Sequence, residues 1–438
     1  ERLIAVSSNP VASGVPTVTA AESTAKQSDF SEFKLPNGAR LLLQPERRLP
    51  NLHLRVLMQG GPMFEVAGKR GATALYTTLL TKDTRRRSAA QVAEFIEQVG
   101  GTFYPFCGNN SVGLAAEVLP PDVDRAIALI ADALLAPAFK ATTFATERDA
   151  QIAALQQDDD DVVTLARKKL RAKFFGHHPM ALDAHGDQAG VKALDVHDLA
   201  ALHRRLCVGP NVVLAVAGDF EPGKLAPKLK ALLAKIPRGA APSGPCASDS
   251  TSPLPAEPGD FTQQEPREQA VVLQGFPGTR VNSPDYYAGE VLDELFSGMA
   301  SRLFERVREE KGLAYFVRSG RFTGLDAGMF YFIAGTQPGR EGEVLAEIDA
   351  EIARVQRGEI EAAEFARCVT RLKAARRQSL QTNSARAMQA GLNALQGLSI
   401  NEWKNYDAHV EAVTVADLAA FATRRLARAR RTQLVVRP

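Results

Sequence analysis

The sequence feature that most constrains the fold of this chain is an internal duplication. Residues 196–206 read VHDLAALHRRL and lead into the apolar run 212–216, while residues 415–426 read VADLAAFATRRL and lead into a second apolar run at 434–436. These two stretches stand 219 residues apart. The pair Phe144-Ala145 matches Phe365-Ala366 at nearly the same offset, 221 residues. Two matches in one register predict a duplicated domain of about 220 residues.

A stretch rich in Pro, Ser, Ala and Gly separates the two copies. It reads PRGAAPSGPCASDSTSPLPAEPGDF and interrupts the hydrophobic periodicity on both sides. Such a composition cannot bury a core, so it is expected to be a linker. We therefore expect an N-terminal tail (1–30), a first domain (31–236), a linker (237–261) and a second domain (262–438).

Each copy alternates short apolar strands with amphipathic helices. The clearest expected elements of the first copy are strands at 52–58, 112–118 and 212–217, and helices at 89–99 and 122–135. Several strands follow one another closely, as hairpin partners do. The predicted fold is α+β, with two tandem homologous domains that each contain a mixed, largely antiparallel sheet covered by helices.

Composition excludes several classes of function. The chain has 53 Lys and Arg against 50 Asp and Glu, and the basic residues are scattered, which argues against a nucleic-acid partner. No run reaches the roughly 20 apolar residues of a membrane span. The four cysteines lie far apart without a zinc-ribbon spacing. A Ser-, Thr- and Ala-rich segment at residues 7–26 slightly favours the periplasm over the cytoplasm.

An ordered series of short motifs resembles the pitrilysin/insulinase peptidases. Their order and spacing, from about residue 31 to the C-terminus, carry the resemblance rather than any one of them. In chain order the motifs are Leu35-Pro36-Asn37-Gly38, Gly60-Gly61 with Glu65, Gly71, Gly100-Gly101, His178-Pro179, Gly186, Val216-Ala217-Gly218-Asp219, Ser301-Arg302-Leu303-Phe304, Arg308-Glu309 and Gly312-Leu313-Ala314-Tyr315.

The resemblance implies a zinc site whose ligands are missing from this chain. In the family, a His-x-x-Glu-His motif on a helix supplies two ligands and a catalytic base, because residues four apart share one helix face. Ala74 and Thr78 stand at the histidine positions and Thr77 at the base position, while the third ligand, a Glu in the family, is replaced by Ala154. We therefore expect neither metal nor cofactor in this chain.

Two other groups of polar residues are expected to be structural. His177 and His178 are adjacent, and neighbouring residues diverge in most backbone conformations, so a metal site there is disfavoured. The acidic run 158–161 lacks the glycine and the alternating acceptors of a calcium loop. We expect it to be the solvated start of a helix, where the helix dipole favours negative charge.

A second functional pair of the family is retained. Family members carry an Arg near the end of a helix and a Tyr at the start of the next strand, seven residues later. Arg308 and Tyr315 have this spacing, and Lys311-Gly312 between them is typical of a glycine-capped helix end. A guanidinium can bind substrate carbonyls, and a phenol can donate to the oxyanion of a tetrahedral intermediate.

These features imply the zinc-free, substrate-binding subunit of a heterodimeric metallopeptidase, similar to the non-catalytic subunit of mitochondrial processing peptidase. The expected partners are a zinc-bearing homologous subunit and a peptide substrate, with Arg308 and Tyr315 acting in trans. The glycine-rich loop of the mitochondrial subunit is reduced here to residues 296–300, which favours a bacterial-type member. The alternative is an inactive scaffold of the same fold, like the core proteins of a respiratory complex.

Overall fold

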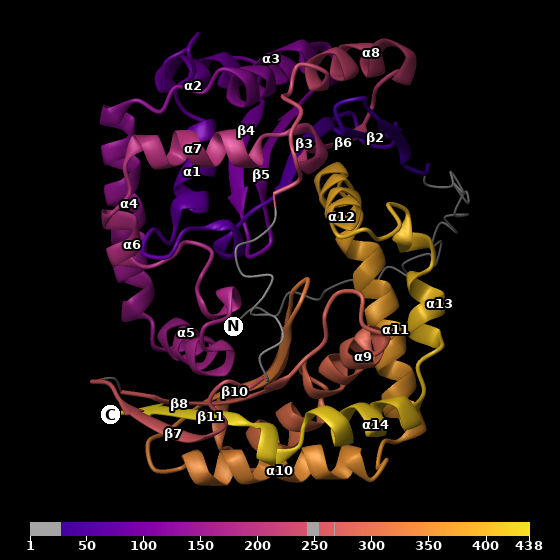
Figure 1. Ribbon diagram of the computed structural model, residues 1–438. Coiled ribbons are helices and arrows are strands. Elements are labelled where there is room, and N and C mark those ends of the chain that lie inside the picture. Colours follow the sequence, from indigo (N-terminus) through magenta and orange to yellow (C-terminus); the bar gives the residue numbers. More distant parts are fainter. Residues whose placement is uncertain (1–27, 243–253, 267) are drawn as a thin grey trace, which may run out of the picture.

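The computed structural model describes residues 28–242, 254–266 and 268–438. They form two halves, each built on one sheet (Figure 1). The first sheet has the order β1-β2-β6-β3-β5-β4 and the second β7-β11-β8-β10-β9. The strands are β1 (Ser31–Lys34), β2 (Arg40–Pro45), β3 (Leu52–Gln59), β4 (Thr102–Cys107), β5 (Ser111–Val118), β6 (Val213–Gly218), β7 (Gly259–Gln264), β8 (Ala270–Pro277), β9 (Ala314–Thr323), β10 (Gly328–Thr336) and β11 (Thr432–Arg437).

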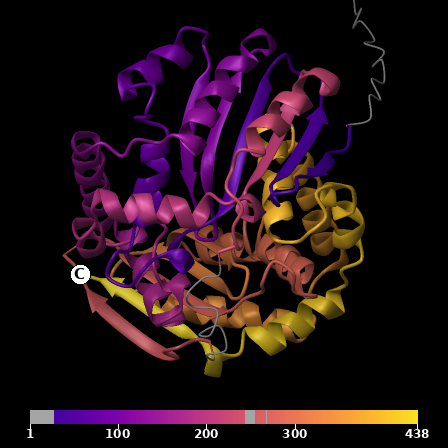
Figure 2. The same cartoon turned by 45° about the horizontal axis from the view of Figure 1, so that its top comes forward.

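The two sheets share one topology, which confirms the predicted α+β class and the mixed, largely antiparallel sheets. In the first sheet β6 pairs parallel with β2 and antiparallel with β3. In the second, β11 pairs parallel with β7 and antiparallel with β8. The remaining neighbours are antiparallel in both sheets. Strand β1 has no counterpart in the described part of the second sheet, and in the tilted view the first sheet stands above the second half (Figure 2).

The helices follow the same duplication. Helices α7 and α14 both begin with a capping box, formed by Asp195 and Asp198 in one and by Thr414 and Asp417 in the other. The α-helices are α1 (Ala72–Leu80), α2 (Ala89–Glu97), α3 (Val123–Leu135), α4 (Ala141–Asp160), α5 (Val162–Phe175), α6 (Gln188–Lys192), α7 (Val196–Leu206), α8 (Pro222–Leu233), α9 (Tyr286–Phe296), α10 (Glu341–Gln356), α11 (Ala362–Ser379), α12 (Asn383–Leu395), α13 (Tyr406–Glu411) and α14 (Val415–Arg425).

The predicted boundaries fall close to the ends of these elements. The first domain, 31–236, starts with β1 and closes shortly after α8, whereas the last three residues of the expected linker, 259–261, already belong to β7. Residues 1–27 of the expected tail and 243–253 of the expected linker lie outside the described residues. Within the part of the chain that the structure describes, no helix is long and apolar enough to cross a bilayer.

The acidic run is placed differently from the prediction. Asp158, Asp159 and Asp160 end helix α4, and Asp161 alone starts the next helix, where its side chain caps α5 by accepting from the Thr164 N–H at 2.6 Å. Carboxylates at a helix C-terminus face the unfavourable end of the dipole. Lys168 Nζ offsets this at 3.2 Å from Asp158 and 3.3 Å from Asp159.

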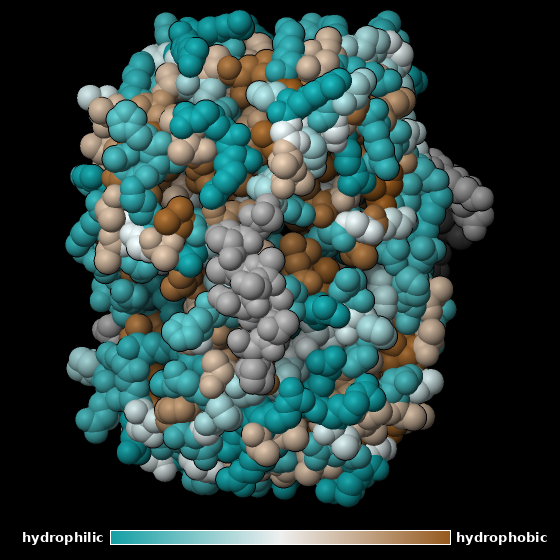
Figure 3. Space-filling model, in the orientation of Figure 1, coloured by the Kyte–Doolittle hydropathy of each residue, from teal (hydrophilic) through white to brown (hydrophobic). Residues whose placement is uncertain are grey.

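Each sheet is covered on one face by helices of its own half and on the other by a helix from the opposite half. Helix α5 packs its buried Leu170 and Phe174 onto β8 and β11 of the second sheet. Helix α12 packs Ala387, Ala390 and Ala394 onto β3 and β6 of the first. In Figure 1 both helices lie between the two sheets, and Figure 3 shows hydrophobic residues in the hollow between the halves.

Polar contacts fix α12 on the first sheet. The buried Arg386 donates to the Gln44 side chain at 3.0 Å, and Asn383 donates to the Asn51 carbonyl at 3.1 Å. The Arg55 guanidinium, on β3, donates to Ser384 at 3.3 Å. Burying these groups without partners would be costly, so the bonds define one docking position for the helix.

We predict that Gly391→Ala destabilises the protein, although alanine is the better helix former. A Cβ at this position of α12 would lie 2.2 Å from Leu57 Cδ1, and the Leu57 side chain is fully buried. Overpacking of this kind costs about 1–3 kcal/mol, more than the helix-propensity gain of about 1 kcal/mol. The free energy of unfolding in urea measures the change.

Gly342→Ala in α10 is the matched control. No atom lies within 4 Å of a Cβ built at that position, so this variant should be neutral or stabilised by up to about 1 kcal/mol. If Gly391→Ala is as stable as Gly342→Ala, close packing of α12 on β3 does not hold the halves together.

Candidate functional site

The four positions predicted to correspond to the family's zinc ligands and base lie at one cleft. Ala74, Thr77 and Thr78 come from α1 and Ala154 from α4, and all four line a cavity of about 340 Å³. Helices α1 and α4 pack against each other. The structure therefore brings together residues that are far apart in the sequence and that the motif comparison assigned to a single site.

A buried carboxylate fixes the helix that carries three of these positions. Glu65 accepts from the Gly71 N–H at 2.9 Å, from the Thr73 N–H at 2.7 Å and from the Thr73 hydroxyl at 2.5 Å. These donors belong to the first turn of α1, whose backbone N–H groups have no partner within the helix. Burial raises the pKa of the Glu65 carboxyl, and the hydrogen bonds oppose that effect. Helix α1 is thus held in place independently of any metal.

The cleft positions do not offer a zinc ligand set. Ala74 and Ala154 end in methyl groups, which have no lone pair to donate. The Thr77 hydroxyl donates to the carbonyls of Thr73 at 3.1 Å and Ala74 at 2.9 Å, so it is engaged within its own helix. A neutral hydroxyl such as that of Thr78 is a poor ligand for zinc, which prefers thiolate, imidazole and carboxylate.

The other polar groups around the cleft are already engaged. Glu147 pairs with Lys82 at 2.9 Å, and His185 Nδ1 lies 3.0 Å from the Asp183 carboxylate. Burial raises the pKa of the Cys107 thiol to about 12, so it stays protonated. Among the described residues, no three His, Cys, Asp or Glu side chains lie close enough together to hold a metal ion. The residues present at the cleft therefore do not fit zinc.

The histidine pair is divided between two environments. His178 Nε2 lies 3.2 Å from the Asp326 carboxylate of the second half, and its Nδ1 accepts from the Met180 N–H at 3.1 Å. Both ring nitrogens are therefore occupied by protein groups. His178 connects the two halves, which is a structural role.

Arg308 lies on an irregular helical turn. Residues Phe304–Glu310 form a π-helix, η6, which ends at Lys311 and Gly312 as the sequence predicts, with Gly312 at φ +57°. The Arg308 guanidinium lies 4.7 Å from the centre of the Phe304 ring, and its Nε is 3.6 Å from Glu309. Its side chain is 45% exposed. Such π-helical turns are frequent at functional sites.

Tyr315 lies in a β-bulge. Gly335 of β10 pairs with Phe316, but the next residue, Thr336, pairs with Ala314, so Tyr315 is the extra residue on β9. The side chain is 51% exposed, an unusual fraction for a large hydrophobic residue at the start of a strand. Its hydroxyl makes no hydrogen bond with any other described residue. A bulge re-aims a side chain away from the regular alternation of a strand.

Sequence reasoning located Arg308 and Tyr315 but missed the backbone around them. The spacing of seven residues and the glycine after Lys311 are visible in the sequence. The π-helix is not visible there, and neither is the bulge, which depends on how strand β9 pairs with β10. Neither Arg308 nor Tyr315 lines the cleft of α1 and α4, so the two parts of the predicted site stay separate within this chain.

Comparison with known proteins places these features in a family. Insulinase (peptidase family M16) matches residues 46–187, and the peptidase M16 inactive domain matches residues 193–372. An uncharacterized zinc protease of Streptomyces coelicolor is 26% identical over 401 residues, covering 89% of this chain and 85% of the relative. One of Mycobacterium leprae is 28% identical over 338 residues, covering 77% and 76%.

Solved structures share the fold. A protease from Helicobacter pylori superposes with a TM-score of 0.86 at 20% identity, covering 94% of this chain and all of that one. A peptidase M16 inactive domain from Pseudomonas fluorescens gives 0.83 at 21% identity, covering 94% and 98%. A chain of complex III₂ from Candida albicans gives 0.75 at 17% identity, covering 93% and 95%. The resemblance to the pitrilysin/insulinase peptidases is confirmed: this chain belongs to peptidase family M16, with an insulinase-type first part followed by an M16 inactive-type domain.

Proposed function

We propose that this chain is the zinc-free, substrate-binding subunit of a heterodimeric zinc metallopeptidase. Arg308 and Tyr315 would act in trans on a peptide held at the zinc site of a homologous partner subunit. The observation that carries the proposal is the contrast between the two sites. The cleft of α1 and α4 is formed but offers no zinc ligands. Arg308 and Tyr315, in contrast, are exposed on irregular backbone.

The chemistry of the pair suits peptide hydrolysis. The partner's zinc would polarise the scissile carbonyl and activate a water. Tyr315 has a free phenol that can donate one hydrogen bond to the oxyanion, where charge develops in the transition state. The planar fork of Arg308 can donate to backbone carbonyls of the peptide and hold it in register.

Exposure distinguishes these two residues from structural ones. A strand tyrosine that serves the core is buried, with its hydroxyl bonded to protein. Tyr315 is half exposed, and Arg308 contacts Phe304 and Glu309 of its own helical turn. π-Helical turns and β-bulges both recur at functional sites. These features support a binding role for the pair.

The alternative is an inactive scaffold. It is supported by the likeness of the fold to a chain of the respiratory complex from Candida albicans. A scaffold needs the surfaces of the two halves but is indifferent to the donors of Arg308 and Tyr315. Co-purification from the source organism, with identification of the bound subunit, tests the heterodimer directly: a homologous chain with an intact His-x-x-Glu-His motif is expected.

We predict that the isolated wild-type chain retains no stoichiometric zinc after exhaustive dialysis, because Ala74, Thr78 and Ala154 supply no ligands. Elemental analysis measures the metal content. One zinc per chain that survives replacement of both His177 and His178 by Ala would contradict the proposal.

The reverse change should restore a metal site. Ala74→His, Thr77→Glu, Thr78→His and Ala154→Glu together place the family's ligands and base around the preserved cleft, and about one zinc per chain is expected. In the matched control, Ala153→Glu replaces Ala154→Glu. Ala153 is on the same helix but does not line the cleft, so zinc binding should be much weaker. Equal binding by both variants would show that α4 is not oriented as described.

Tyr315→Phe removes a single donor with little change of shape. In the assembled heterodimer we expect kcat to fall by about 10²–10³-fold, as for other oxyanion donors, with a smaller effect on KM. Peptide hydrolysis by the reconstituted subunits measures both constants. Gel filtration shows whether assembly is unchanged.

Arg308→Lys keeps the charge but loses the planar fork, so KM should rise as well. Arg306→Lys is the matched control, because Arg306 lies on the same turn but is paired with Glu310 and Glu347. If the Arg308 and Tyr315 variants assemble and cleave peptides at the wild-type rate, the chain is a scaffold.

A further inference from the structure

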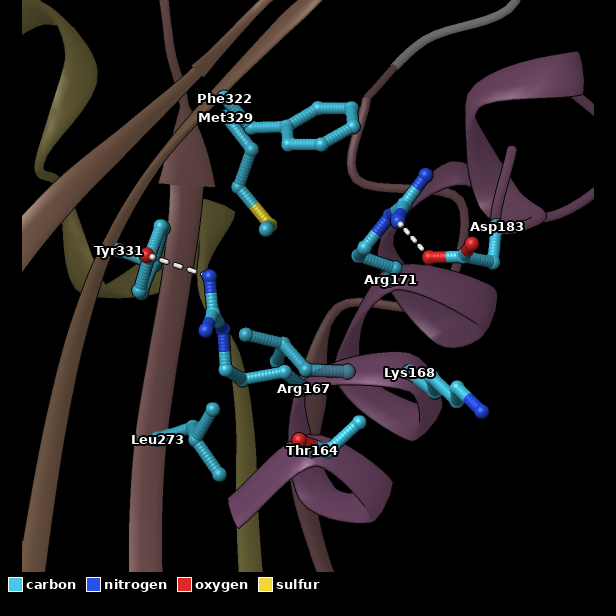
Figure 4. Close-up of a pocket in the computed structure, with 10 residues that line it drawn as sticks. Thr164, Arg167, Lys168, Arg171, Asp183, Leu273, Phe322, Met329 and Tyr331 are labelled. Carbon is cyan, nitrogen blue, oxygen red and sulfur yellow. Dashed lines mark hydrogen bonds and ion pairs between the residues drawn. The ribbon is translucent and has the colours of Figure 1, made fainter. Parts of the chain in front are cut away.

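A small cavity lies between α5 and the second sheet, apart from both sites described above. Its volume is about 180 Å³. Leu273, Phe322 and Met329 supply much of its apolar wall, and Arg167 and Tyr331 are among its polar groups (Figure 4). None of the lining residues belongs to the cleft of α1 and α4. Helix α5 crosses the second sheet in the space between the halves (Figure 1).

Two glycines in one row of the sheet make room for two side chains that line this cavity, Tyr331 and Met329. Tyr331 on β10 is paired with Gly275 on β8 and with Gly320 on β9. A Cβ at Gly320 would lie 2.6 Å from the Tyr331 ring, so the ring can lie flat over that strand only because a glycine is there. A Cβ at Gly275 would lie 3.0 Å from Met329 Sδ. The two glycines therefore let Tyr331 and Met329 lie close against the sheet.

Arg167 places a cationic guanidinium with unused hydrogen-bond donors at the rim of the cavity. Its guanidinium donates to the Tyr331 hydroxyl at 3.3 Å and lies 5.8 Å from the centre of the tyrosine ring. The side chain is exposed, and it forms no ion pair with any carboxylate in the described residues. Tyr331 therefore orients the guanidinium without neutralising it.

The other two cations of the cavity are already paired. Arg171 lies 3.4 Å from Asp183 and donates to the Met180 carbonyl at 3.0 Å. Lys168 is bound by the carboxylates at the end of α4, and in Figure 4 its ammonium points away from Arg167. Asp183 itself is held by Arg171 and His185, so its charge is compensated. Arg167 is left as the cation of this cavity that can accept an outside anion.

We infer that this cavity receives the C-terminal end of a peptide, with the terminal carboxylate on Arg167 and an apolar last side chain against Leu273, Phe322 and Met329. A planar guanidinium matches a carboxylate with two parallel hydrogen bonds. The volume is below the roughly 300–1,000 Å³ of pockets for drug-sized ligands but suits one side chain. An internal Asp or Glu offers a carboxylate without the apolar group that the wall would contact. This inference rests on the proposed peptide-binding function.

Binding of labelled peptides to the isolated full chain tests the assignment. The probe is a mixed-sequence pool, all ending in leucine, with a fluorophore at the N-terminus. It is compared with the same pool as the C-terminal amide, and with an amidated pool that contains an internal glutamate. Fluorescence anisotropy should show the free acid binding at least about tenfold more tightly than either amide, as expected for loss of a charge-assisted hydrogen bond.

Arg167→Gln should remove the preference for the free acid, because the glutamine keeps polarity but loses the charge and the fork. Arg204→Gln is the matched control. Arg204 is an exposed helical arginine of α7 that does not line the cavity, and this variant should keep the full preference.

Four results would overturn the inference. If the internal glutamate restores binding of the amidated peptides, the cavity binds acidic side chains rather than the C-terminal carboxylate. If acid and amide bind equally, or if Arg167→Gln keeps the preference, the cavity is not the carboxylate site, while the proposed substrate-binding function stands. If no pool binds the chain, that proposed function fails as well.

Discussion

Helix α12 supplies the first sheet with a cover that the first half of the chain does not provide, and α5 does the same for the second sheet. The strands β3, β6 and β8 are buried almost throughout, so both faces of each sheet must be covered. The helices of each half reach only one face. Exchange of α5 and α12 resolves this requirement, and it makes the two halves one folding unit despite the linker between them.

The exchange also explains why the candidate sites lie where they do. Because α5 and α12 hold the two halves together, α1 and α4 are not needed for that contact and can form a cleft in the first half. The cleft is held by Glu65 at the start of α1 and by Gln151, whose amide donates to the Gly71 carbonyl at 3.1 Å. None of these contacts involves a zinc ligand. The cleft can therefore keep its shape while Ala74 and Thr78 stand at the predicted ligand positions.

Much of the fold could be predicted from the sequence, because duplication and alternation of apolar residues are visible in one chain. The strand at 52–58 and the helix at 122–135 lie within one residue of the observed ends. The exchange could not be predicted, since the apolar faces of α5 and α12 do not indicate which sheet each helix packs against. The end of α4 was also missed: acidic residues favour a helix start, but Lys168 stabilises them at a helix end. The bulge at Tyr315 depends on pairing between strands, which a linear pattern does not contain.

The two copies of the duplicated unit differ most informatively at one corresponding place. In the first copy a regular helix, α2, is followed by Gly100 at φ +65° and then by β4, whereas in the second copy the π-helix η6 is followed by Gly312 at φ +57° and then by β9. The glycine connection is common to both because the chain must reverse there. A regular helix such as α2 is therefore compatible with the topology at this place, and the fold does not require the π-helix η6. The π-helix and bulge in the second copy therefore need another explanation, and the proposed presentation of Arg308 and Tyr315 to a peptide provides one.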